Sequence, residues 1–136
     1  MGKVQTSRKL AMQLLFQLAF NEEKEGGLRK DLLIENQVME ESKKNALELA
    51  EKAWEEKEQT DTLIKKYAID WKMDRINIVD KSLLRLGFYE LLYTETAESV
   101  IINEILELAK KFSTNESSKF INGILGAYVK DLKEDV

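Results

Sequence analysis

The chain has 136 residues, close to the size of one ordinary domain and enough to bury a hydrophobic core. It contains no proline, cysteine or histidine, which excludes disulfides, thiolate zinc sites, cysteine nucleophiles and histidine-based acids, bases or metal ligands. Its net charge of −4 argues against indiscriminate binding of polyphosphate. Since good helix formers are abundant, we expect one all-α domain over residues 1–136, without catalytic residues, metal or cofactor.

Charge is distributed unevenly along the chain. Residues 1–21 carry three basic side chains and no acidic one, and residues 108–130 carry four basic side chains and one acidic. Between them, residues 22–61 carry 7 basic and 13 acidic side chains. Two positive segments that flank an acidic one suit a localised anionic site.

The first predicted helix, Thr6–Phe20, has one face for the core and a second face with a different composition. At about 100° per residue, Lys9, Gln13, Phe16 and Phe20 fall together opposite the apolar stripe. Two interpretations stay open for this face. It is an aromatic platform for a base or a partner, or a neighbouring segment covers both rings as a second core contact.

The same segment imitates a secretion signal, because an apolar run follows the basic residues. Gln13 and Gln17 interrupt that run, no small-residue cleavage site follows it, and it is far shorter than the roughly 20 residues that span a bilayer. We therefore expect a soluble, cytoplasmic protein without a membrane contact.

Helices are also expected through the acidic middle of the chain. Gly26 and Gly27 in a charged stretch predict a loop after the first helix. Thr60 and Asp61 resemble a cap that opens a short helix. The helices expected here cover residues 30–40, 42–57 and a short segment that ends at residue 68.

A long central helix follows a break at residues 70–74, where Trp71 is expected to anchor the turn. The helix begins near Arg75 and is apolar on most sides, which is typical of a helix packed on several neighbours. Gly87 in its middle predicts the close approach of another helix. Glu90 projects toward the apolar side, where a carboxylate must find hydrogen-bond donors or remain neutral. We favour a structural role for it over a catalytic one.

Two more helices complete a count of about seven. Thr96 and Ser99 signal the start of one that ends near Lys111. The last is announced by Ser113 followed three residues later by Glu116, the pattern of a capping box.

Three stretches of the sequence resemble one family. Residues 7–16 (SRKLAMQLLF) are similar to its basic first helix, and residues 81–91 (KSLLRLGFYEL) to its central helix. Residues 102–112 (INEILELAKKF), followed by 119–125 (KFINGIL), resemble its most specific signature. On these residues the chain is identified as a member of the NusB family of bacterial transcription antitermination factors, with similar spacings over essentially the whole chain.

The resemblance implies a fold, an activity and partners. The fold is two helical bundles packed nearly at right angles. The RNA ligand is the single-stranded boxA element of nascent transcripts, and the protein partner is the small-subunit ribosomal protein called NusE in its antitermination role. The assembly joins the elongating RNA polymerase, and the free protein is expected to be a monomer or a weak homodimer.

The resemblance also implies site residues. In the family the basic first helix meets RNA, and a loop near the last helix contributes further contacts. Here the RNA-binding residues are expected to be Lys3, Arg8, Lys9, Gln13, Phe16, Lys119 and Asn122. The partner-binding residues are expected to be Asp80 and Glu116. Asp80 has an equally weighted alternative, stabilisation of a helix dipole. Because only three cations remain where the family is arginine-rich, we expect weak RNA binding without the partner.

Two other functions remain as alternatives. The first is a helical adaptor that contacts proteins without touching RNA, its basic patches serving solubility. The second is enzymatic, an RNA hydrolase or a detached methyltransferase accessory. The absence of histidine, cysteine and a glycine-rich phosphate loop makes the enzymatic alternative the weaker one.

Overall fold

The computed structural model describes the backbone of residues 3–21 and 40–134, and the side chains of residues 6–20 and 40–134. Within these ranges every regular element is helical, which confirms the all-α prediction. The loop at Gly26 and Gly27 and the helix predicted for residues 30–40 lie outside them, save Glu40. The elements are α1 (Lys3–Asn21), α3 (Glu40–Glu55), α4 (Lys57–Tyr67), the 3-10 turn η1 (Met73–Arg75), α5 (Ile78–Tyr93), α6 (Glu98–Phe112) and α7 (Asn115–Glu134).

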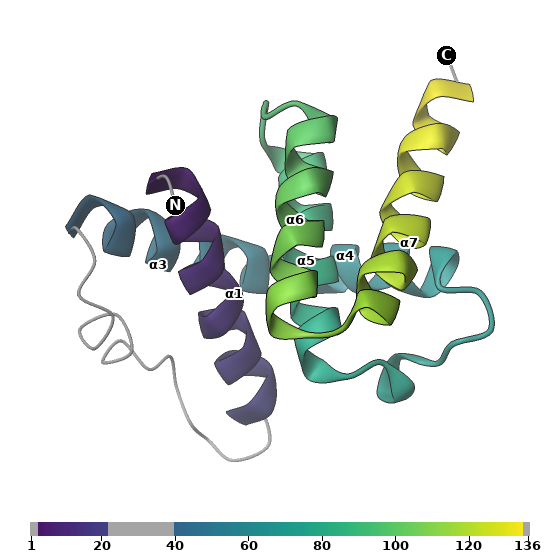
Figure 1. Ribbon diagram of the computed structural model, residues 1–136, viewed down its shortest axis with the longest axis horizontal. Helices are drawn as coiled ribbons and strands as arrows, with labels where there is room; N and C mark the ends of the chain where they lie inside the picture. The colour runs from purple at the N-terminus through teal and green to yellow at the C-terminus, as the bar shows by residue number, and fades with distance from the viewer. Residues whose placement is uncertain (1–2, 22–39, 135–136) are drawn as a thin grey trace.

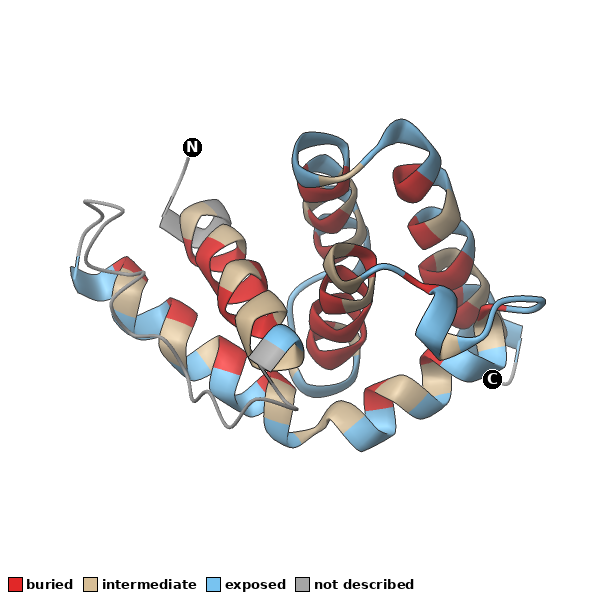
Figure 2. Ribbon diagram, turned by 90° about the horizontal axis from the view of Figure 1, so that it is seen from below, coloured by how far each residue is buried: buried red, intermediate tan, exposed pale blue. Residues whose placement is uncertain are grey.

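The helices run in two main directions. Helices α3 and α4 follow one another along one side of the molecule, across the direction of α5, α6 and α7 (Figures 1 and 2). Helix α1 packs on α3 and α5, while α4, α6 and α7 pack on α5 from its other sides. Helix α5 therefore belongs to two bundles, one with α1 and α3 and the other with α4, α6 and α7. The prediction of two roughly perpendicular helical bundles is confirmed. No described helix is both long and apolar enough to cross a membrane.

The neighbouring helices bury the centre of α5. Leu83, Leu86 and Phe88 are fully buried, and Figure 2 shows buried residues where the helices face one another. A Cβ added to Gly87 would lie 3.2 Å from a methyl group of Leu125 on α7 and 3.5 Å from Ile105 on α6. The predicted close approach at Gly87 is thus confirmed, because two helices meet α5 there.

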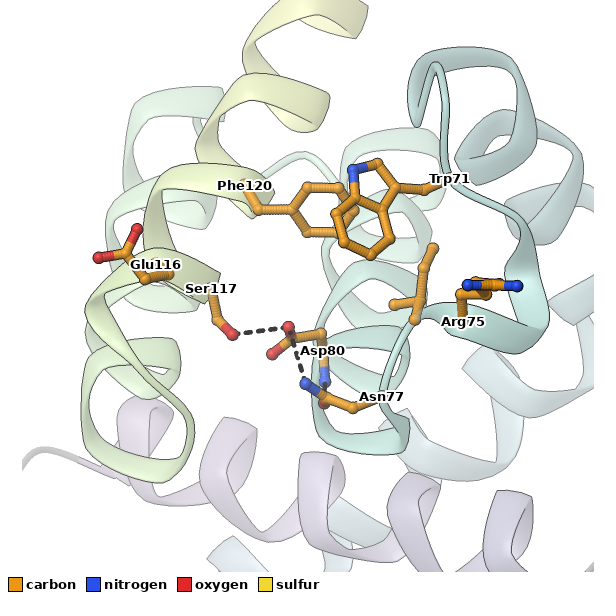
Figure 3. A pocket seen from close by; sticks show the side chains of 8 residues that line it. Trp71, Arg75, Asn77, Asp80, Glu116, Ser117 and Phe120 are labelled. Carbon is orange, nitrogen blue, oxygen red and sulfur yellow. Dashed lines mark hydrogen bonds between the residues drawn. The ribbon is translucent and has the colours of Figure 1, made fainter.

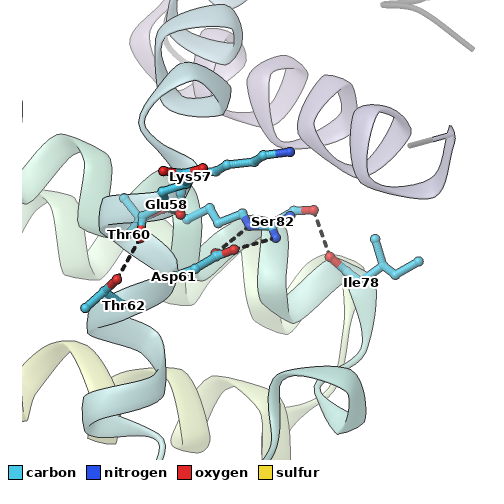
Figure 4. Close-up of polar contacts among 8 residues, drawn as sticks. Lys57, Glu58, Thr60, Asp61, Thr62, Ile78 and Ser82 are labelled. Atoms are coloured by element: carbon cyan, nitrogen blue, oxygen red, sulfur yellow. Dashed lines mark hydrogen bonds and ion pairs between the residues drawn. The ribbon is translucent and has the colours of Figure 1, made fainter. Parts of the chain in front are cut away.

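Helix α4 is fastened to α5 by an ion pair. The guanidinium of Arg85 donates to both carboxylate oxygens of Asp61, at 2.8 and 2.9 Å (Figure 4). The prediction that Thr60 and Asp61 cap this helix is wrong, because α4 already begins at Lys57. The Thr60 hydroxyl instead donates to the carbonyl of Lys57, and the carboxylate that could have capped a helix is taken by Arg85.

Two helix starts shape the surface near α5 and α7. Helix α5 starts at Ile78, three residues later than expected, because residues 73–75 form η1. Its cap is Asn77, whose side chain accepts a hydrogen bond from the backbone N–H of Asp80 at 2.8 Å. In α7 the capping oxygen belongs to Thr114, one residue after the predicted Ser113, and it accepts from the backbone N–H of Ser117 at 2.9 Å.

Candidate functional site

The inner side of α1 carries a buried ion pair. The Arg8 guanidinium donates from Nε to Oε2 of Glu90 and from Nη2 to Oε1, each at 2.9 Å, and both residues are 4% exposed. The prediction that Glu90 must find donors is confirmed. The position of Arg8 on the helix turns it toward α5, so the structure gives no support to its predicted contact with RNA.

Lys9, the next residue, lies on the outer side of α1. Lys9 is half-buried, and its ammonium lies 5.9 Å from the ring centre of Phe112, the last residue of α6. Phe112 is 37% exposed and follows Lys110 and Lys111, both exposed, in the last turn of that helix. A cation from α1 therefore meets an aromatic ring of α6 in a helix turn that carries two further lysines, of which Lys110 lies 3.7 Å from Glu107. A cation beside a partly exposed ring is an arrangement suited to phosphates and stacked bases.

Further along α1, the predicted residues continue the same side. Gln13 and Phe16 are half-buried, and Phe20 is 53% exposed. The rings of Phe16 and Phe20 lie 6.1 Å apart and nearly parallel. Both side chains remain partly accessible, so this side keeps rings at the surface. The side chain of Lys3 lies outside the described residues.

The second predicted RNA segment lies on another part of the molecule. Lys119 and Asn122 are both exposed on α7. Helix α6 lies between α7 and α1 (Figures 1 and 2). These two residues therefore lie on a different helix from Lys9, Gln13 and Phe16.

The two residues predicted to bind the partner line one pocket. Asp80 at the start of α5 and Glu116 at the start of α7 both border a cavity of about 240 Å³ beside η1 (Figure 3). Glu116 is exposed, whereas Asp80 is only 5% exposed. The fold thus brings together two carboxylates that are far apart in the sequence.

The Asp80 carboxylate is held by neutral groups. Its Oδ2 accepts from the hydroxyl of Ser117 at 2.7 Å and from the side-chain amide of Asn77 at 3.1 Å. Its Oδ1 is buried and has no hydrogen-bond partner among the described residues. Asp80 therefore has a structural role at the start of α5, and its charge remains without an ion-pair partner in the described part of the chain.

Sequence reasoning missed three aromatic residues of these sites. The sequence suggests no site role for Phe112 or Phe120, and it predicts only that Trp71 anchors a turn. In the structure Phe112 lies beneath Lys9, and Trp71, 54% exposed, packs edge-to-face on Phe120 at 5.6 Å in the wall of the pocket. A tryptophan within a polar break is a signal that could have suggested a surface role for Trp71.

Comparison with known proteins agrees with this geometry. Residues 5–130 match the model of the NusB family. The chain is 38% identical to the transcription antitermination protein NusB of Symbiobacterium thermophilum, over 93% of this chain and 89% of that protein. It is 36% identical to the protein of the same name from Koribacter versatilis, over 96% and 91% of the two chains.

Solved structures show the same architecture. NusB of T. maritima superposes with a TM-score of 0.81 at 30% identity, covering 96% of this chain and 92% of that one. A crystal structure of the antitermination factors NusB and NusE in complex with double-stranded RNA gives 0.82 at 27% identity, covering 95% and 97%. The fold defines a small helical protein of the same class as these factors. The chain belongs to the NusB family.

Proposed function

We propose that this protein is a transcription antitermination factor that acts in the cytoplasm as part of the elongating RNA polymerase complex. In this proposal it binds single-stranded, boxA-like RNA jointly with NusE and catalyses no reaction. The observation that carries the proposal is the meeting of Lys9 and Phe112 on one partly exposed surface. A solved complex of NusB and NusE with double-stranded RNA supports the RNA and NusE parts of the proposal, because this chain shares the NusB fold over nearly its whole length.

The proposed RNA surface consists of the outer side of α1 and the end of α6. Lys9, Lys110 and Lys111 supply positive charge for phosphates, while Phe16 and Phe112 offer rings on which unpaired bases stack. Stacking on a ring requires an unstacked base, which favours single strands over duplexes. Arg8 has no place in this surface, because Glu90 already occupies its guanidinium.

NusE is needed in the proposal because the RNA surface is small. Few cations release few counterions, so the affinity of this protein alone is low and falls with salt. A partner bound alongside adds its own RNA contacts at high effective concentration, and the pair holds RNA better than either protein. Lys119 and Asn122 on α7 are candidates for a second contact with the same RNA.

A three-component titration tests the proposal. Labelled boxA-like RNA, as a single strand and as a duplex, is titrated with the protein in the presence and absence of NusE. We expect the tightest binding for the single strand with NusE. RNA binding that is absent from every mixture, with NusE still bound, would overturn the RNA part and leave a protein-only adaptor.

A charge reversal identifies the surface. Lys9→Glu should weaken binding of the single strand, because one phosphate contact is lost. The slope of log affinity against log salt, which is negative, should become shallower by about 1. Lys65→Glu is the matched control, since Lys65 is exposed on α4, away from the proposed surface. Equal affinities for the two variants would remove α1 from the RNA site.

A further inference from the structure

The ends of α3 and α5 meet on a surface that the proposed function does not use. The hydroxyl of Tyr93, the last residue of α5, donates to Oε2 of Glu56, the residue that follows α3, at 3.0 Å. The C-terminus of a helix carries a partial negative charge, and α5 has no basic residue in its last turn to balance it. Two helix ends and a carboxylate therefore make this region, the α3–α5 junction, electronegative.

An open pocket of about 190 Å³ at the junction has a buried hydroxyl group in its wall. The lining residues are Asn45, Glu48, Leu49, Lys52, Tyr89 and Thr94. Tyr89 is only 8% exposed, and its hydroxyl makes no hydrogen bond among the described residues. Its ring packs on that of Tyr93, which is 48% exposed, with 5.2 Å between the ring centres. A buried hydroxyl without a partner gains free energy from a ligand that hydrogen-bonds to it.

Carboxylates outnumber cations around that hydroxyl. Burial raises the pKa of Tyr89, and the ammonium of Lys52 lowers it in part. The carboxylates of Glu48, Glu55 and Glu56 raise it as well, so they lie close enough to act on the hydroxyl. Lys52 is held by Glu48 at 3.0 Å, and both side chains are about half exposed. Because an exposed pair of this kind contributes little, an incoming cation can displace Lys52 and take its place.

We propose that the α3–α5 junction binds an arginine side chain from a basic segment of a second protein partner, distinct from NusE. The planar guanidinium stacks on the exposed ring of Tyr93 and donates hydrogen bonds to the Tyr89 hydroxyl and the neighbouring carboxylates. The ammonium of lysine is more strongly hydrated and stacks less well. RNA is disfavoured as the occupant, because three carboxylates repel phosphates.

The position of the junction favours a partner other than NusE. Asp80, one of the two residues predicted to bind NusE, and Tyr93 lie near opposite ends of α5, about 20 Å apart along the helix. A protein bound at the junction therefore leaves the start of α5 free. In this arrangement the protein can hold RNA and NusE with one part of its surface and a further protein with another.

The first test uses a minimal probe and needs neither RNA nor NusE. An acetylated and amidated heptapeptide of alternating glycine and arginine is titrated into the protein labelled with ¹³C in its tyrosine rings. We expect saturable shifts of the Tyr89 and Tyr93 resonances. Those of Tyr67 and Tyr128 should stay unchanged, because these rings pack on each other between α4 and α7. The citrulline version of the heptapeptide, an uncharged isostere, should bind at least about tenfold more weakly.

Removal of a single hydroxyl tests the role of Tyr89. Tyr89→Phe should weaken binding of the arginine heptapeptide by about fivefold. The melting temperature should not fall, since the lost hydroxyl makes no hydrogen bond among the described residues. Tyr128→Phe is the matched control: its hydroxyl is equally buried and equally without a hydrogen bond there, but it lies on α7. Equal affinities for the two variants would overturn the assignment.

Two charge changes at the junction should have opposite signs. Glu48→Gln removes an acceptor and should weaken binding of the heptapeptide by about threefold. Lys52→Gln removes the competing cation and should strengthen binding by about as much. Lys65→Gln, the same change at an exposed position of α4 that does not line the pocket, is the control for charge at long range. Equal strengthening by both lysine variants would overturn the proposal.

The identity of the occupant is tested by competition. The heptapeptide titration is repeated with the protein saturated with NusE, and we expect an unchanged affinity. Displacement of the heptapeptide by NusE would overturn the assignment to a second partner. No shift of Tyr89 and Tyr93 with the arginine heptapeptide, equal shifts with its citrulline version, or a stronger response to single-stranded RNA would overturn the proposal as a whole. None of these outcomes affects the binding of NusE itself, so the proposed function is judged separately.

Discussion

Helix α5 carries a buried carboxylate near each end, and the two are held in different ways. Glu90 meets the guanidinium of Arg8 through two hydrogen bonds of 2.9 Å. Asp80 is as deeply buried, but its partners are the neutral groups of Asn77 and Ser117. The charge of Glu90 is neutralised by Arg8, whereas the charge of Asp80 is stabilised only by neutral groups and by the dipole at the start of α5.

This difference distinguishes a buried charge that stabilises the fold from one that remains able to bind a ligand. A buried pair that is complete contributes to the fold and offers nothing to a ligand, while a buried charge beside a cavity can still gain free energy by binding. The same distinction divides α1, where Arg8 faces inward and the adjacent Lys9 faces outward. Basic residues in one short segment therefore have different roles, according to the side of the helix on which they lie.

The largest effect on stability is expected at Glu90. Glu90→Gln leaves the Arg8 guanidinium buried without its counter-charge, which should lower the free energy of unfolding by about 3–5 kcal/mol. Urea denaturation measures the change. The double variant Arg8→Met with Glu90→Leu should recover most of it, because no charge is then buried. A loss of less than about 1 kcal/mol in the single variant would show that Arg8 and Glu90 do not form the buried ion pair described above.

The middle of α5 should respond less strongly. Gly87→Ala gains about 1 kcal/mol of helix propensity but presses a methyl group against Leu125 at 3.2 Å, so we expect a net loss of about 1–2 kcal/mol. Gly123→Ala is the matched control, because an added Cβ there meets nothing within 4 Å, and it should gain up to about 1 kcal/mol. Thermal unfolding of both variants tests whether Gly87→Ala destabilises the protein and Gly123→Ala stabilises it. Stabilisation by Gly87→Ala would contradict the tight contact.

At Asp80 the expected effect on stability is smaller still. Asp80→Asn can keep the hydrogen bond from Ser117 and removes an unpaired buried charge, while it loses a dipole interaction of about 0.3–1 kcal/mol. The free energy of unfolding should therefore change by less than about 1 kcal/mol. A loss as large as that of Glu90→Gln, measured in the same urea series, would mean that Asp80 is mainly structural.

The smallest effect is expected for an exposed pair. Lys52 donates to Glu48 at 3.0 Å, and this hydrogen bond lowers the pKa of the Glu48 carboxyl from its ordinary value of 4.5. A lowered folded pKa means that the stabilisation is present above that ordinary value and is lost as the pH falls through the folded pKa. Because both side chains are exposed and screened, Glu48→Gln should leave urea denaturation at neutral pH unchanged. A clear loss of stability would show that burial does not explain the difference in stability contribution between this exposed pair and the Arg8–Glu90 pair.

Much of this protein could be predicted from its sequence, because helical periodicity and capping act locally. The helix-forming composition and the apolar spacing predicted the all-α class and nearly every described helix. The glycine at position 87 predicted a close helix contact, and the burial of Glu90 predicted a need for donors. Boundaries were the weaker part: α4 begins before Thr60, and Thr114 caps α7 in place of Ser113.

Pairings between distant segments were decided only by the tertiary structure. Helical spacing places Arg8 on the core side of α1, but nothing near it in the sequence shows that its guanidinium meets Glu90. Nor does anything near Lys9 show that a ring from α6 lies beneath it. Likewise, Asp80 and Glu116 border one cavity only because α7 packs beside the start of α5. Electrostatic and packing energies depend on distance and burial in three dimensions, whereas spacing along the chain determines which side of its own helix a residue occupies.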